Sequence, residues 1–303
     1  MKRILIFLLV NLAAVATLTM VAAIVCALCG IDPSAITGES FAPLLLFAFI
    51  FGMGGSVVSL LLSKPIVKAT MKCRTIDGSE GAAERWLVDT IADLSRKAGI
   101  AMPEVAVYPG EANAFATGAR KNAALVAVST RITEQMSREE LRAVLGHEIS
   151  HVANGDMVTM CLTQGVINTF VIFFSHVIAS IVRGAIENRD SGRRSRGAGS
   201  YWIYHMTVQF FQLVFGIFAT IVLMWYSRRR EYAADAGSAK LLGSPAPMIA
   251  ALRRLGNLQP GVLPDSIKAF GICGKASVFS SHPSMEERIS ALEKMYNAPV
   301  MTA

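Results

Sequence analysis

Charged residues are scarce in this sequence. Lys, Arg, Asp and Glu make up 17% of its 303 residues, whereas 53% are hydrophobic and the mean hydropathy is +0.46. Soluble domains carry about 25% charged residues, so the composition excludes an ordinary soluble domain and predicts a membrane protein. The net charge is +7. Because many basic residues lie next to long apolar runs, anionic lipid headgroups and membrane topology explain them better than nucleic acid does. No nucleic-acid partner is expected.

Cysteine is scarce as well. The five cysteines are scattered and odd in number, so they predict no disulfide framework. Cys26 and Cys29 match the C-x-x-C pattern of redox and metal sites, but they lie inside an apolar run and no second pair accompanies them. We interpret them as small hydrophobic residues.

Long apolar runs, by contrast, occur four times. The run in residues 1–30 is uncharged after its basic start, long enough to span a bilayer and without a small-x-small cleavage site. We therefore expect a retained transmembrane helix there rather than a signal peptide. Residues 41–63 form a second expected span. Residues 157–182 and 201–226 form two more, which an Arg-rich loop joins into a hairpin over residues 157–227.

The basic residues predict the topology of these spans. They precede the first span and follow the second, so the positive-inside rule places both ends of this pair in the cytoplasm. Residues 228–230, three arginines, mark a return to the cytoplasm after the fourth span. The loop of residues 183–200 holds five arginines and violates the rule if the flanking spans cross fully. We expect the first two spans to set the orientation of the protein in the membrane, so that this loop is translocated across the bilayer despite its charge. The alternative is a hairpin that does not cross completely.

Residues 64–156 and 228–303 lie outside the spans and are predicted to form two cytoplasmic parts. In the first part, residues 104–108 and 123–129 have the composition of short strands. Residues 137–140, Ser-Arg-Glu-Glu, form a capping box that begins a helix. A small sheet is therefore expected before this helix. Its edge could pair with an extended peptide, or the sheet could only brace the helix.

The helix that follows the capping box carries the pattern H-E-x-x-H, from His147 through Glu148 to His151. Two histidines four residues apart project from one helical face, which lets two neutral imidazoles bind one zinc ion. Glu148 lies beside them and is able to take a proton from a zinc-bound water. The alternative is a pair of histidines with only a structural role in the helix.

A catalytic zinc needs a third protein ligand and one open position. The third histidine of the longer pattern H-E-x-x-H-x-x-G-x-x-H is missing, because Asn154 and Met157 occupy the relevant positions. Glu231 is the best candidate, since a helical hairpin returns its two ends to the same membrane face. Asp235, four residues on, could accept the second ring N–H of a ligand histidine. Spacing alone supports equally well that both carboxylates only pair with the arginines at residues 228–230.

Four motifs together closely resemble the HtpX family of bacterial inner-membrane zinc metallopeptidases, which is related to CAAX prenyl proteases and Oma-type mitochondrial peptidases. The motifs are Asn-Ala-Phe-Ala-Thr-Gly at residues 113–118, the H-E-x-x-H pattern with Asn-Gly-Asp at 154–156, Arg-Glu-Tyr-Ala-Ala-Asp at 230–235, and Ser-His-Pro-Ser at 281–284. The resemblance covers nearly the whole chain. It implies an α-helical membrane protein with four transmembrane helices and an α+β zincin-like catalytic domain that carries a small β-sheet.

The resemblance also implies the roles of individual residues. It places one Zn²⁺ per chain on His147, His151 and Glu231, with Glu148 as general base and acid. Asp235 would not bind the metal but would accept a hydrogen bond from the second ring N–H of a ligand histidine.

Two further residues receive roles from the resemblance. Asn113 would lie near the bound peptide, and His282 would stabilise the oxyanion. The two cytoplasmic parts would then form one catalytic unit.

The implied function is zinc-dependent endopeptidase activity at the cytoplasmic side of the bacterial inner membrane. Polypeptide substrates would be misfolded or damaged proteins of the membrane and its cytoplasmic face, handled alongside other quality-control proteases under envelope stress. A zinc-binding scaffold or chaperone that does not cleave is the first alternative. The presence of Glu148 argues against it, because a structural zinc site needs no carboxylate at that position and is closed by four protein ligands. A transporter is the second, and four spans without charged residues argue against that.

Overall fold

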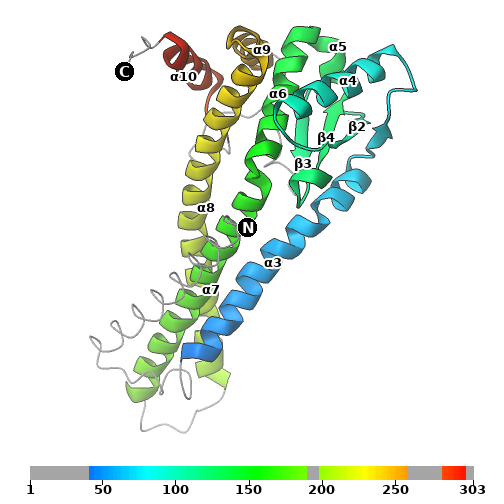
Figure 1. Cartoon of the computed structure of the whole chain (residues 1–303). Helices are drawn as coiled ribbons and strands as arrows, with labels where there is room; N and C mark the ends of the chain where they lie inside the picture. Colours follow the sequence, from blue (N-terminus) through cyan, green and yellow to red (C-terminus); the bar gives the residue numbers. More distant parts are fainter. Residues whose placement is uncertain (1–40, 190–197, 258–281, 298–303) are drawn as a thin grey trace. The chain divides into compact units, whose positions relative to one another are not determined.

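The computed structural model describes residues 41–189, 198–257 and 282–297 (Figure 1). The expected span in residues 1–30 and the centre of the Arg-rich loop lie outside the described residues. The chain divides into two units: residues 1–58 with 161–223, and residues 59–160 with 224–303.

Three helices of the described chain are long and apolar enough to cross a membrane. They are α3 (Phe41–Thr70), α7 (Asp156–Arg189) and α8 (Ala198–Leu242). Each contains one of the expected spans and extends beyond it. The extension is longest in α8, which continues through the arginines at residues 228–230 into an Ala-rich segment, because these residues are good helix formers.

In the first unit, α3 packs against α7. Phe41 of α3 lies edge-on to Phe173 of α7, with 6.1 Å between the ring centroids. A Cβ atom on Gly52 would lie 2.5 Å from the backbone nitrogen of Thr169, so only glycine permits this close helix contact. The outer sides of α3 and α8 expose large apolar side chains, as expected of helices in lipid: Leu46, Phe51, Phe210, Leu213 and Phe218.

The second unit contains a four-stranded sheet. Its strands are β1 (Arg74–Ile76), β2 (Glu104–Tyr108), β3 (Ala114–Thr117) and β4 (Leu125–Ser129), in the order β1-β2-β4-β3. β2 and β4 are parallel, and the two outer pairs are antiparallel. The strand expected at residues 104–108 is confirmed. The one expected at 123–129 begins two residues later, because Lys121–Ala123 form a 3₁₀ turn.

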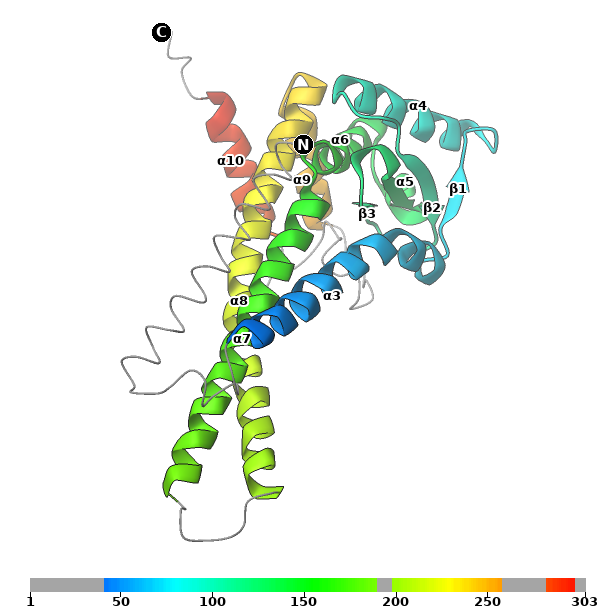
Figure 2. The same cartoon turned by 60° about the horizontal axis from the view of Figure 1, so that its bottom comes forward.

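Helices cover both faces of this sheet. Alternate side chains, such as Val105 and Val126, pack into a core formed with α4 (Ala82–Lys97) and α6 (Arg138–Asn154). The other set, including Tyr108 and Phe115, packs against Val67 near the end of α3. Figure 2 shows the sheet beside α4 and α6. Shorter helices complete the unit: α5 (Thr130–Gln135), α9 (Ala246–Asn257) and α10 (Met285–Asn297).

Local signals set the ends of α6. The Ser137 hydroxyl accepts a hydrogen bond from the Glu140 backbone N–H, and the Glu140 carboxylate accepts one from the Ser137 N–H, which confirms the capping box. Gly155 ends the helix with φ 70°, a left-handed conformation that glycine adopts without strain. Because α7 starts directly after this turn, the helix that carries H-E-x-x-H is followed at once in the sequence by a candidate membrane span.

Candidate metal centre

Small residues bring α6 and α8 into close contact. A Cβ atom on Gly237 would lie 2.5 Å from Ser150 Oγ, and one on Gly146 would lie 2.8 Å from Ser238 Oγ. Ser238 Oγ also donates a 2.7 Å hydrogen bond to the Ala143 carbonyl of α6. This contact places the segment of α8 that begins at residue 231 directly against the H-E-x-x-H turn.

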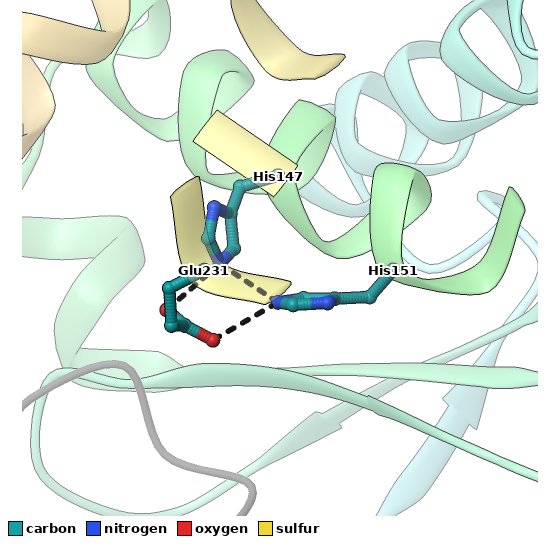
Figure 3. A group of neighbouring side chains, drawn as sticks. All are labelled: His147, His151 and Glu231. Carbon is teal, nitrogen blue, oxygen red and sulfur yellow. Dashed lines mark hydrogen bonds and ion pairs between the residues drawn. The ribbon is translucent and has the colours of Figure 1, made fainter. Parts of the chain in front are cut away.

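His147, His151 and Glu231 converge at this contact, 84 residues of sequence separating the first and last (Figure 3). The two Nε2 atoms are 3.1 Å apart. Glu231 Oε1 lies 3.2 Å from His151 Nε2, and Oε2 lies 3.5 Å from His147 Nε2. His147 and Glu231 are buried, and His151 is partly buried. The structure thus brings together the three residues that the sequence analysis selected as metal ligands.

Carboxylates hold the opposite nitrogens of both imidazoles. His147 Nδ1 lies 2.8 Å from Asp235 Oδ1, and His151 Nδ1 lies 2.7 Å from Asp156 Oδ2. An ionised carboxylate can only accept, so each Nδ1 donates its proton, and in the neutral imidazole each Nε2 is then left with a lone pair for a metal ion. Two nitrogen lone pairs and the Glu231 carboxylate then face one another in a buried space, an arrangement that a cation stabilises. Two imidazoles and one carboxylate are a ligand set of catalytic zinc sites.

The formal charges of the surrounding side chains lead to the same conclusion. Four buried carboxylates lie at or directly behind the histidines, and two guanidinium groups pair with them. An ion with two positive charges would therefore neutralise the cluster. The carboxylates are Glu148, Asp156, Glu231 and Asp235, and the guanidiniums are Arg230 and Arg288.

Asp156 and Arg288 are site residues that sequence reasoning missed. Asp156 opens α7 directly after Gly155; the sequence showed it only as the last residue of the Asn-Gly-Asp motif and gave it no role. Arg288 lies on α10 and is fully buried, with Nε and Nη2 donating to the two oxygens of Asp235 at 2.8 and 2.6 Å. Burial alone would lower the pKa of Arg288, but Asp235 and Glu231 outweigh it and raise the pKa. An arginine in an amphipathic helix normally indicates a solvated face, so the sequence did not indicate that Arg288 is buried beside the site.

Glu148 and His282 lie in the same cluster. Glu148 is buried beside the two candidate ligand histidines, and this burial raises the pKa of its carboxyl group. His282 is also buried, and its Nδ1 lies 2.8 Å from Glu231 Oε2.

Asn113 immediately precedes β3, at the edge of the sheet. Its backbone carbonyl accepts hydrogen bonds from the Ser129 N–H at 2.9 Å and the Tyr108 hydroxyl at 3.3 Å. Its own N–H donates to Ser129 Oγ at 3.0 Å. The backbone at the entrance to β3 is therefore held firmly, and β3 itself packs beside α6 (Figure 2).

Comparisons of the sequence with known proteins show which family the chain is similar to. The family model described as "Peptidase family M48" matches residues 82–296. A "Protease HtpX homolog" of Acidovorax ebreus (strain TPSY) is 49% identical over 300 residues, covering 98% of this chain and 100% of the relative. The "Protease HtpX homolog" of Herminiimonas arsenicoxydans is also 49% identical over 300 residues, covering 97% of this chain and 100% of the relative.

A solved structure shares the fold. The crystal structure of S. mikatae Ste24p matches with a TM-score of 0.58 at 20% identity, covering 82% of this chain and 58% of that one. Its identity is low, so it bears on the fold alone. The family model and the two relatives bear on descent, and they show that this chain belongs to peptidase family M48 and is a membrane metallopeptidase.

Proposed function

We propose that this protein is a zinc-dependent endopeptidase of the bacterial inner membrane, with its active site on the cytoplasmic side. The observation that carries the proposal is the pair of Nε2 atoms, 3.1 Å apart, that lie beside the Glu231 carboxylate while both Nδ1 atoms are held by aspartates. In this proposal His147, His151 and Glu231 hold one Zn²⁺ per chain.

Zinc, when bound, would act as a Lewis acid that polarises the scissile carbonyl and makes water more acidic. The side chains carry out the proton transfers. Glu148 takes a proton from the attacking water and later delivers it to the leaving amine. Asp235 keeps the proton of His147 on Nδ1, as its 2.8 Å contact supports. His282 would donate to the oxyanion, and its place beside Glu231 puts it within the cluster.

The edge strand β3 supports a polypeptide as substrate. β3 is the last strand in the sheet order, and among the described strands it pairs with β4 alone. An extended peptide could add to its free edge by main-chain hydrogen bonds. Asn113, at the start of this strand, would then lie near the peptide. The substrates that we propose are misfolded or damaged proteins of the membrane and its cytoplasmic face, shared with other quality-control proteases.

Exposed aromatic residues on α8 support a complete membrane crossing. Tyr201 and Trp202 are exposed near its start, and Trp225 is exposed farther along. Aromatic side chains of this kind gather at both membrane interfaces. Trp202 and Trp225 are separated by roughly 35 Å of helix at 1.5 Å per residue, which matches a hydrocarbon core of about 30 Å. Glu231 follows Trp225 by six residues, so we place the metal site just outside the bilayer, next to the three arginines.

A single comparison tests the proposal against a scaffold that binds zinc without cleaving. The full-length protein is purified in detergent, its zinc content is measured, and cleavage of unfolded casein is followed with and without a chelator. We expect about one zinc per chain and cleavage that the chelator abolishes. His151→Ala should contain no zinc and should not cleave. Stoichiometric zinc without any cleavage by the wild-type protein would favour the scaffold.

A further inference from the structure

The two candidate ligand histidines are each backed by a carboxylate and an arginine. Arg288 pairs with Asp235, which contacts His147. Arg230 pairs with Asp156, which contacts His151. The two arrangements differ in burial. Arg288 and Asp235 have exposed fractions of 0% and 1%, whereas the Arg230 side chain is 24% exposed.

We propose that Arg288 is a positioning residue that sets the geometry of the metal site through Asp235 and Glu231. This inference rests on the proposed function, because it concerns the same zinc ligands. Arg288 Nη2 also lies 3.3 Å from His147 Nδ1, the ring nitrogen that faces Asp235 and not the metal site. Arg288 acts on the carboxylates behind and beside the ligands.

The contacts of the guanidinium explain how it positions them. Nε and Nη2 bind the two oxygens of Asp235 in a fork, which fixes the plane of that carboxylate. Asp235 Oδ1, which takes one arm of the fork, also accepts the His147 Nδ1–H. The orientation of the imidazole therefore depends on the fork. A lysine would supply the charge but not the two fixed donors.

The third nitrogen of the same group reaches a ligand. Arg288 Nη1 lies 3.3 Å from Glu231 Oε2. Glu231 and Asp235 are one helical turn apart on α8, so one rigid planar group bridges the ligand carboxylate and the carboxylate behind the ligand histidine. The planar guanidinium of Arg288 therefore restrains the position of Glu231 relative to His147.

A second arginine–carboxylate contact of α10 provides a matched control for the packing of this helix. Met285, Ile289 and Leu292 of α10 belong to the apolar core of the unit. On the surface, Arg253 of α9 pairs with Glu293 of α10 at 3.4 Å, and both side chains are largely exposed. Arg253→Met therefore removes an arginine–carboxylate contact of α10 without touching the metal site.

The test uses the full-length protein in detergent, in a Glu148→Gln background that prevents self-cleavage. Zinc affinity is measured by competition with a chromophoric chelator, and the visible absorption spectrum is recorded with Co²⁺ in place of zinc. We expect Arg288→Met to lower zinc affinity by about 10–100-fold and to alter the Co²⁺ spectrum at full loading. Arg288→Lys should recover part of the affinity, and Arg253→Met should match the parent protein in both measurements.

A double variant adds a test of the pathway through Asp235. Arg288→Met combined with Asp235→Asn should lower the affinity by clearly less than the product of the two single losses, because both substitutions remove the restraint that runs through Asp235. Losses that multiply would show that Arg288 acts independently of Asp235 and would overturn the proposed route.

A purely structural role gives a different result. Arg288→Met would then melt at a lower temperature but keep the zinc affinity and Co²⁺ spectrum of Arg253→Met, and the inference would be wrong. Where Arg288→Met does not fold, Arg288→Lys decides: unchanged affinity and spectrum overturn the inference, and changes in both support it. Failure of the proposed function is distinguishable, because the parent protein would then bind no zinc, or the wild-type protein would hold zinc without cleaving casein, whatever residue stands at position 288.

Discussion

The Nε2 atoms of His147 and His151 lie 3.1 Å apart, and the Nδ1 atoms of the same rings donate to Asp235 and Asp156. When both imidazoles are neutral, their Nε2 lone pairs repel each other at this distance unless a cation lies between or beside them. The ligand site is thus built by the aspartates behind the imidazoles as much as by the imidazoles.

Glu148→Gln should keep zinc and lose proteolysis. The amide cannot take the proton of the attacking water, and general base catalysis contributes about 10²–10⁴-fold to such rates. Zinc content and casein cleavage are measured on the same sample. Glu139→Gln is the control, because Glu139 is an exposed carboxylate in the first turn of the same helix. Full activity in Glu148→Gln would remove this residue from the mechanism.

Asp156→Asn should weaken zinc binding by about 10–100-fold, since the residue orients His151 and fixes its proton on Nδ1. Chelator competition measures the affinity. Asp93→Asn is the matched control, because Asp93 pairs at 2.6 Å with Arg142, a partly exposed residue of α6, the helix that carries His151. Equal affinities in the two variants would show that Asp156 only caps α7.

Gly237→Ala should destabilise the contact between α6 and α8. The added methyl group would meet Ser150 Oγ at 2.5 Å, and overpacking of this kind costs about 1–3 kcal/mol. A lower melting temperature and a lower zinc affinity should appear together, because the same contact positions Glu231. Gly216→Ala is the control on the same helix, where the new methyl group meets nothing within 4 Å. If both variants melt alike, the close contact does not support the site.

Glu104 should contribute to stability in a pH-dependent way. Burial would raise the pKa of its carboxyl group, but Lys64, Lys68 and Thr75 outweigh it and lower the pKa to about 2. A carboxyl pKa below the unfolded value of about 4.3 stabilises the folded state above that pH. This contribution is lost as the pH falls toward 2.

The difference in unfolding free energy between wild type and Glu104→Gln measures this effect. It should be about 1–2 kcal/mol at pH 7, after allowance for solvent screening, and should vanish between pH 4.3 and 2. A difference that does not change over this range would show that the ion pairs with α3 contribute nothing.

Features that depend on neighbouring residues were predictable from the sequence. The capping box at Ser137, the turn at Gly155 and the spacing of His147 and His151 all involve residues within about one helical turn. Such interactions depend on the local backbone, so they leave a local pattern. The strand at residues 104–108 and the three helices with long apolar runs were predictable for the same reason.

Contacts between distant segments were harder to predict. Glu231 could be proposed only from the return of a hairpin and from family resemblance, because on spacing alone it was equally well an ordinary helix carboxylate. The edge strand β3 has no alternating pattern, since all four of its residues are buried. It forms a strand because β4 supplies its hydrogen bonds.

The sequence by itself determined which two histidines are candidate ligands, which glutamate is the candidate base, and that the chain carries long apolar helices. Only the tertiary structure decided what holds the ligands in place. Asp156 reaches His151 across the turn at Gly155, and Arg288 reaches Asp235 from a helix 53 residues away. Neither contact leaves a local pattern, because a buried ion pair depends on two surfaces meeting and either partner alone resembles an ordinary surface charge.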